Sequence, residues 1–145
     1  MDSSATPTTL GALVNLRPAA GLIALSMDEQ PSIVNPVYEN APHLWMCLEG
    51  PRASDGRFRY LPFRTFPIGW GENDAMPRPP NHWVNGNPSD RMRRGRLDLS
   101  TFVWLSSDEV SEQVGLWDYF EASTRPVLAP AGVDSLRRAF ERSRR

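Results

Sequence analysis

The sequence predicts a small single α+β domain, in which an antiparallel sheet carries one covering helix and a short C-terminal helix. Three segments have strand-like patterns, and one segment after them has both a helix start signal and helical spacing of apolar residues. Fourteen prolines interrupt most of the chain, but the span between Pro88 and Pro126 has none and can hold long regular elements. An all-β sandwich or jelly roll is the alternative fold.

The first nine residues, MDSSATPTT, are polar and rich in Ser and Thr, so we expect a flexible N-terminal arm. Residues 10–145 are expected to form the globular domain, which ends in an arginine-rich tail. The apolar pieces 10–16 and 19–27 are each short enough to be a strand or a helical turn. Pro36 makes segment 32–38 an edge strand or an extended loop.

A β-hairpin is predicted over residues 43–66. Segment 43–49 is apolar throughout, GPRASDG supplies turn residues, and residues 57–66 then alternate in an extended pattern. The following residues 67–90 hold five Pro and three Gly, which indicates a long ordered loop anchored by Trp70 and Trp83.

The next strand is predicted from Leu97 to Leu105, with Phe102 and Trp104 as buried residues on one of its faces. Ser106–Glu109 then fits a capping box, and the apolar spacing beyond it favours a helix over residues 107–123. A strand over 114–122, reached through a hairpin loop at 106–113, is the alternative. The last helix is expected from a narrow apolar stripe: Val133, Leu136 and Phe140.

One segment, GRLDLSTFVWLSSD…VGLWDYFEASTRP, resembles the last hairpin of the jelly-roll coat proteins of small RNA viruses. The resemblance covers about thirty residues and implies the all-β alternative and a place in a virus particle. The chain departs from that family because it is short and its basic arm is C-terminal instead of N-terminal.

Charge is segregated along the chain although the net charge is only −1. Residues 1–50 carry −4, residues 51–106 carry +4, residues 107–124 carry −5 without any base, and residues 125–145 carry +4. All sixteen basic residues are Arg, which a GC-rich coding sequence or a need for bidentate contacts with phosphate and carboxylate would both explain. Such blocks suit pairing with complementary protein surfaces, and two of them suit a polyanion.

Chemical motifs are scarce. Cys47 lies in an apolar run and is expected to be a buried inert thiol, and His43 and His82 lie in unrelated contexts without a partner signature. The carboxylate pairs Asp108–Glu109 and Glu72–Asp74 fit a helix start and a polar loop. The glycine motifs that bind phosphate, GxxxxGK(S/T) and GxGxxG, do not occur. We therefore expect no catalytic residue, no cofactor and no metal site.

The sequence favours a non-enzymatic structural or assembly protein that binds copies of itself or a partner, such as a component of a virus or phage particle. An arginine-dependent nucleic-acid-binding or regulatory module is the second reading, and a small enzyme or effector is the third. No signal peptide or membrane span is expected, which places the protein in the cytoplasm or in a particle. The residues expected to contact a protein or nucleic-acid partner are all arginines: Arg57, Arg59, Arg91, Arg93, Arg94, Arg96, Arg137, Arg138 and Arg142.

Overall fold

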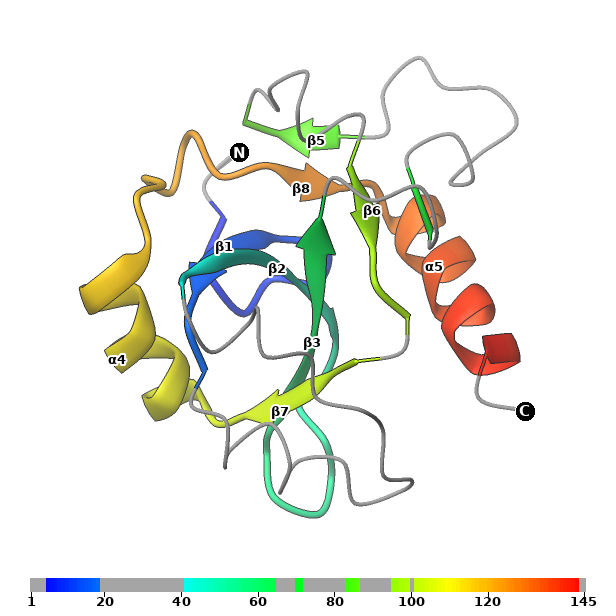
Figure 1. Cartoon of the computed structure of the whole chain (residues 1–145), viewed down its shortest axis with the longest axis horizontal. Helices are drawn as coiled ribbons and strands as arrows, with labels where there is room; N and C mark the ends of the chain where they lie inside the picture. Colours follow the sequence, from blue (N-terminus) through cyan, green and yellow to red (C-terminus); the bar gives the residue numbers. More distant parts are fainter. Residues whose placement is uncertain are drawn as a thin grey trace.

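The computed structural model describes residues 5–18, 41–64, 70–71, 83–86, 95–99 and 101–143. Most of the chain in these ranges belongs to a mixed set of strands and helices (Figure 1), which confirms the predicted α+β class. The strands are β1 Leu13–Leu16, β2 His43–Glu49, β3 Phe58–Arg64, β4 Trp70–Gly71, β5 Trp83–Asn85, β6 Arg96–Leu97, β7 Val103–Leu105 and β8 Val127–Leu128; the helices are α4 Ser107–Trp117 and α5 Pro130–Ser143.

The main sheet is antiparallel and has the order β1-β2-β3-β6-β4, with β7 also paired to β3. The predicted hairpin is confirmed as β2 and β3, in register at Cys47 opposite Tyr60. A register shift between Cys47 and Glu49 then brings Glu49 opposite Arg59. Gly50 leaves the hairpin with φ 135°, where an added Cβ would lie 2.7 Å from the Phe58 ring. The small strands β5 and β8 pair in a second sheet.

The prediction of one continuous strand from Leu97 to Leu105 is wrong. Leu97 pairs with Phe63 and Val103 pairs with Tyr60, so six steps along this segment correspond to three steps along β3. The segment from Leu97 to Val103 is therefore three residues longer than the part of β3 that it faces, so it cannot pair continuously and leaves the sheet between β6 and β7. This detour buries Phe102, whose ring packs edge-to-face on Phe140 of α5 with centroids 5.6 Å apart.

Helix α4 begins as predicted and rules out a hairpin loop at 106–113. The Ser106 hydroxyl accepts from the Glu109 N–H at 3.2 Å, and the Glu109 carboxylate accepts from the Ser106 N–H at 3.2 Å. The predicted end at residue 123 is wrong, because the helix ends at Trp117 and Asp118 is already extended. Asp118 is held there by contacts that a longer helix could not make, as described below.

Helix α5 confirms the predicted C-terminal helix. Pro130 takes its first position, where the missing N–H costs no hydrogen bond. Val133, Leu136 and Phe140 are buried, as the apolar stripe predicted. Gly132 lets the helix approach β8, since a Cβ there would lie 2.9 Å from the Leu128 side chain.

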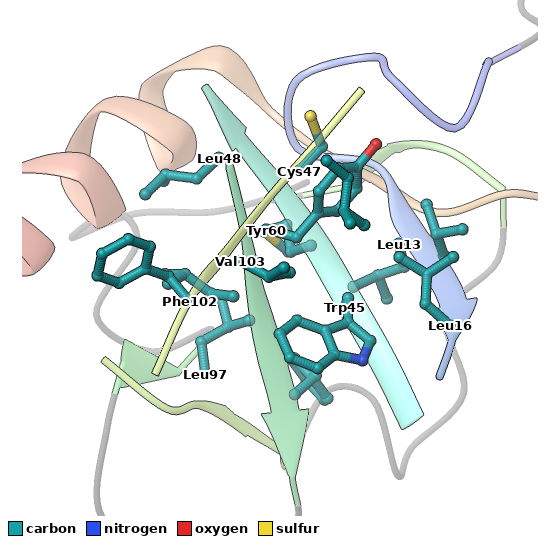
Figure 2. Packing of buried hydrophobic residues seen from close by; sticks show 14 of the residues in the cluster. Leu13, Leu16, Trp45, Cys47, Leu48, Tyr60, Leu97, Phe102 and Val103 are labelled. Atoms are coloured by element: carbon teal, nitrogen blue, oxygen red, sulfur yellow. The ribbon is translucent and has the colours of Figure 1, made fainter. Parts of the chain in front are cut away.

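The core lies on both faces of β2 and β3 (Figure 2). Trp45, Cys47 and Tyr60 lie on the side of β1, while Leu48 and Phe102 lie toward α5. All five side chains are buried, so β2 is covered on both of its faces. Trp104 is only 4% exposed and is a core residue, as predicted.

Residues 5–9, the last part of the expected N-terminal arm, contact the domain. The Ala5 N–H donates to the Ala122 carbonyl at 2.9 Å, and the Tyr60 hydroxyl donates to the Pro7 carbonyl at 2.8 Å. Residues 1–4 and the expected elements at 19–27 and 32–38 lie outside the described residues, as does most of the loop 67–90. In the ranges described, neither helix is long and apolar enough to span a bilayer.

Candidate interaction surface

Arg59 of β3 lies in the core and has a structural role there. It is 7% exposed, its Nε lies 3.0 Å from Glu49 Oε1, and its guanidinium stacks on three aromatic rings. The distances from Cζ to the ring centroids are 4.4, 4.7 and 4.9 Å for Trp104, Phe102 and Phe140. Burial and the Glu49 carboxylate together leave little of this charge for an external phosphate.

Arg57 is half-buried and joins the hairpin turn to α4. Its Nη1 lies 3.1 Å from Glu109 Oε1 and donates to the Trp104 carbonyl at 3.2 Å. Its Nε also lies 3.6 Å from Asp55, which is paired in turn with Arg52 at 2.6 Å. The Arg52 guanidinium lies over the Trp104 ring at 4.2 Å. This group of charges therefore ties β3, β7 and the start of α4 together.

The remaining predicted arginines fall into two groups. On α5, Arg137 lies 3.6 Å from Glu49, while Arg138 and Arg142 are exposed on the outer face of the helix. Arg96 is half-buried in β6. Arg91, Arg93 and Arg94 lie outside the described residues, so their predicted contacts stay predictions. The structure thus leaves Arg138 and Arg142 as the most accessible of the described candidates.

A buried ion pair that the sequence did not predict joins Arg125 to Asp118. Both side chains are almost fully buried, and Nη2 donates to Oδ2 at 2.8 Å and Nη1 to Oδ1 at 3.3 Å. Nη1 also donates to the Leu13 carbonyl at 2.9 Å. Asp118 lies directly after α4, where a carboxylate opposes the helix dipole, and Arg125 supplies the compensating cation.

The free edge of β1 is closed by the segment that contains α4 and the residues after it. The N–H of Leu13 donates to the Pro126 carbonyl at 3.0 Å, that of Asn15 to Asp118 Oδ1 at 2.8 Å, and that of Arg17 to Gln113 Oε1 at 2.9 Å. Since these donors are satisfied inside the molecule, β1 offers no free row of N–H groups for strand addition.

The outer face of α4 is an exposed stripe that combines acids with large apolar side chains. We name it the α4 stripe and define it by Asp108, Ser111, Glu112, Gly115, Leu116 and Tyr119, the last of which lies just beyond the helix. Leu116 is 64% exposed and Tyr119 is 62% exposed. A Cβ at Gly115 would meet no atom within 4 Å, so the stripe faces open space there.

The acids of the α4 stripe are not neutralised within the described part of the chain. Asp108 and Glu112 are exposed and enter none of its ion pairs, in contrast to Glu109, which is held by Arg57. Helix α4 itself contains no base. The stripe is therefore a negatively charged surface with an apolar end.

The groups weighed for catalysis or metal binding do not gather into a site. Burial raises the pKa of the Cys47 thiol to about 12, which keeps it protonated, as the inert-thiol prediction implies. Asp108 and Glu109 lie in the first turn of α4, while His82 and the Glu72–Asp74 pair lie outside the described residues. Within the ranges described, no three His, Cys, Asp or Glu residues are grouped to hold a metal ion.

Comparisons of the chain with protein-family models, with curated proteins and with solved structures gave no match.

Proposed function

We propose that this chain is a non-enzymatic structural or assembly protein and that it binds copies of itself through the α4 stripe. The observation that carries the proposal is the exposure of Leu116 and Tyr119 beside acids that the described chain does not neutralise.

The make-up of the stripe suits a protein contact. Leu116 lies in the last turn of α4 and Tyr119 follows just beyond the helix, so two large exposed apolar side chains lie at the same end of the stripe. Asp108 and Glu112 lie along the same face and supply a polar border. Protein interfaces combine apolar side chains with polar and charged ones at their edge, and the stripe offers both kinds.

The alternative mode of assembly at this end of the molecule is strand addition to β1. The hydrogen bonds of Leu13, Asn15 and Arg17 with the α4 segment use the donors that such a strand would need. Contact through side chains of the α4 stripe requires none of these bonds to break. The helix face is therefore the better candidate at this end.

The negative charge of the stripe favours a basic partner surface, and α5 of the same chain has such a surface. Helices α4 and α5 lie at opposite ends of the longest axis of the molecule (Figure 1). Arg138 and Arg142 are exposed on α5. One copy cannot bring these two surfaces together, but two copies can, with acids of one facing arginines of the other.

Size-exclusion chromatography with light scattering tests the proposal, run over a range of protein concentrations after nuclease treatment. We expect a mass that rises with concentration, and a loss of this rise in Leu116→Gln. Val84, which is 58% exposed on β5, offers a matched control, so Val84→Gln should associate as the native chain does.

Two results would overturn the proposal. One is a monomer at every concentration. The other is association that nuclease treatment abolishes, with the absorbance of nucleic acid in the peak, which would make the exposed arginines of α5 the functional surface.

A further inference from the structure

The exposed acids of α4 and the exposed arginines of α5 have the same spacing. Asp108 and Glu112 are four residues apart, and so are Arg138 and Arg142. At a rise of about 1.5 Å per residue, each pair spans about 6 Å along its helix axis. Two charged pairs with equal spacing can meet at the same time when the helices lie side by side.

The direction of the helices follows from the apolar end of the α4 stripe. In an antiparallel contact that sets Asp108 against Arg142, Glu112 meets Arg138 and the C-terminal end of α4 comes to the first turns of α5. Pro130 and Ala131 are exposed in the first turn of α5, so the apolar end of the α4 stripe comes near an apolar surface.

The parallel arrangement leaves the apolar end of the α4 stripe without a partner surface on α5. It would set Asp108 against Arg138 and Glu112 against Arg142, and Leu116 and Tyr119 would then lie past Ser143, where α5 ends. In the antiparallel arrangement the exposed Asp134 comes opposite Leu116, from where its carboxylate can still reach water.

A symmetric contact between two α4 stripes is disfavoured by charge. In an antiparallel α4–α4 pair the acidic half of each helix meets the apolar half of the other, and no base in α4 satisfies the acids. In a parallel pair the acids of the two copies meet directly. In a pair of α4 with α5, the acids of α4 meet arginines instead.

We infer that copies of this chain associate head to tail, with the α4 stripe of one copy lying antiparallel against the outer face of α5 of the next. This inference rests on the proposed function and adds the partner surface and its register. The two surfaces lie at opposite ends of the molecule (Figure 1). A pair of bound copies therefore still has one free α4 stripe and one free α5 face, and the assembly grows into a ring or an open chain.

Complementary charge reversals test this interface. Glu112→Arg spoils the acidic surface and leaves α5 intact, whereas Arg138→Glu spoils the basic surface and leaves α4 intact. Both residues are exposed on helices and both replacements are good helix formers, so we expect folding to be preserved. Each variant alone should associate about tenfold more weakly or worse in sedimentation velocity, since like charges then face each other.

A 1:1 mixture of the two variants gives the decisive result. Alternating copies would restore native contacts at one junction and reversed charge pairs at the next, so the mixture should regain large species that neither variant forms. Glu121→Arg changes the net charge as Glu112→Arg does but lies beyond the helix, and it should associate nearly as the native chain does.

The failures are distinguishable. A native chain that stays monomeric would contradict the proposed function itself. If the native chain associates, three results would overturn this interface while self-association still holds. They are charge reversals without effect, a mixture that forms no large species, and a Glu121→Arg variant that associates as weakly as Glu112→Arg.

Discussion

Arg125 and Asp118 form the contact on which three separate segments converge. The ion pair lies between α4 and β8, and it also binds the Leu13 carbonyl and the Asn15 N–H of β1. Because both charges are buried, their desolvation is offset only while each keeps the other and these backbone groups. The pair therefore fixes where α4 ends and how it closes the edge of the sheet.

We expect Arg125→Ala to reduce the free energy of unfolding by about 3–5 kcal/mol, because it leaves a buried carboxylate without its cation. Urea unfolding at low protein concentration would measure the loss. Arg142→Ala is the matched control, since this arginine is exposed, and its change should stay within about 0.5 kcal/mol. Equal stability of the two variants would contradict the assigned burial.

Cys47 and Tyr60 predict a sensitivity to alkaline pH. Burial raises the pKa of the thiol from its ordinary value of 9.0 to about 12, and burial also raises the pKa of the Tyr60 hydroxyl above its ordinary value of 10.0. The unfolded chain then releases these protons at lower pH than the folded chain, so stability is complete below about pH 9 and falls as pH rises from there. Each group contributes a slope of up to about 1.4 kcal/mol per pH unit.

Melting temperatures measured from pH 8 to 11 would check this expectation. The native chain should lose stability from about pH 9 upward, and Cys47→Ala should lose it less steeply, because one of the two groups is gone. A melting temperature that stays constant up to pH 11 would show that these side chains are reached by water.

Among the elements, α4 shows how much a local signal can predict. The capping box at Ser106–Glu109 lies within four consecutive residues, so its geometry depends on no distant part of the chain. The hairpin of β2 and β3 was predictable for the same reason, since its turn residues lie between two adjacent apolar segments.

Features that depend on distant partners were not predictable in this way. The gap between β6 and β7 arises because both pair with β3 while Phe102 packs on α5, and no pattern inside 97–105 carries that information. The end of α4 at Trp117 likewise depends on Arg125 and on β1. In both cases a tertiary contact outweighs a continuous local pattern.

Ser106→Ala should destabilise the protein by about 0.5–2 kcal/mol, because the Glu109 N–H loses its acceptor. Gly115→Ala in the same helix should be neutral or stabilising, since Ala is the better helix former and a Cβ meets open space there. Thermal unfolding of both variants at low protein concentration provides the measurement. A loss in Gly115→Ala as large as in Ser106→Ala would mean that the outer face of α4 is already covered in the monomer.

At the scale of the whole molecule, the charge blocks of the sequence become surfaces only in part. The buried pair removes one charge from each of the last two blocks, and Arg57 and Arg59 are bound to acids of the same chain. The sequence therefore predicted an arginine-rich candidate site, of which Arg138 and Arg142 are the exposed described members on α5. The exposed apolar end of α4 was not predictable, because helical spacing alone does not show that Leu116 faces solvent.

The most direct test of the account is hydroxyl-radical footprinting of the native chain at a dilute and at an associating concentration. Leu116 and Tyr119 are exposed in the single copy, so both should be oxidised readily in the dilute sample. Association through the α4 stripe predicts that their oxidation falls severalfold at the higher concentration while that of the exposed Val84 is unchanged. Equal oxidation of Leu116 and Tyr119 in monomer and assembly would contradict the claim that this face joins the copies.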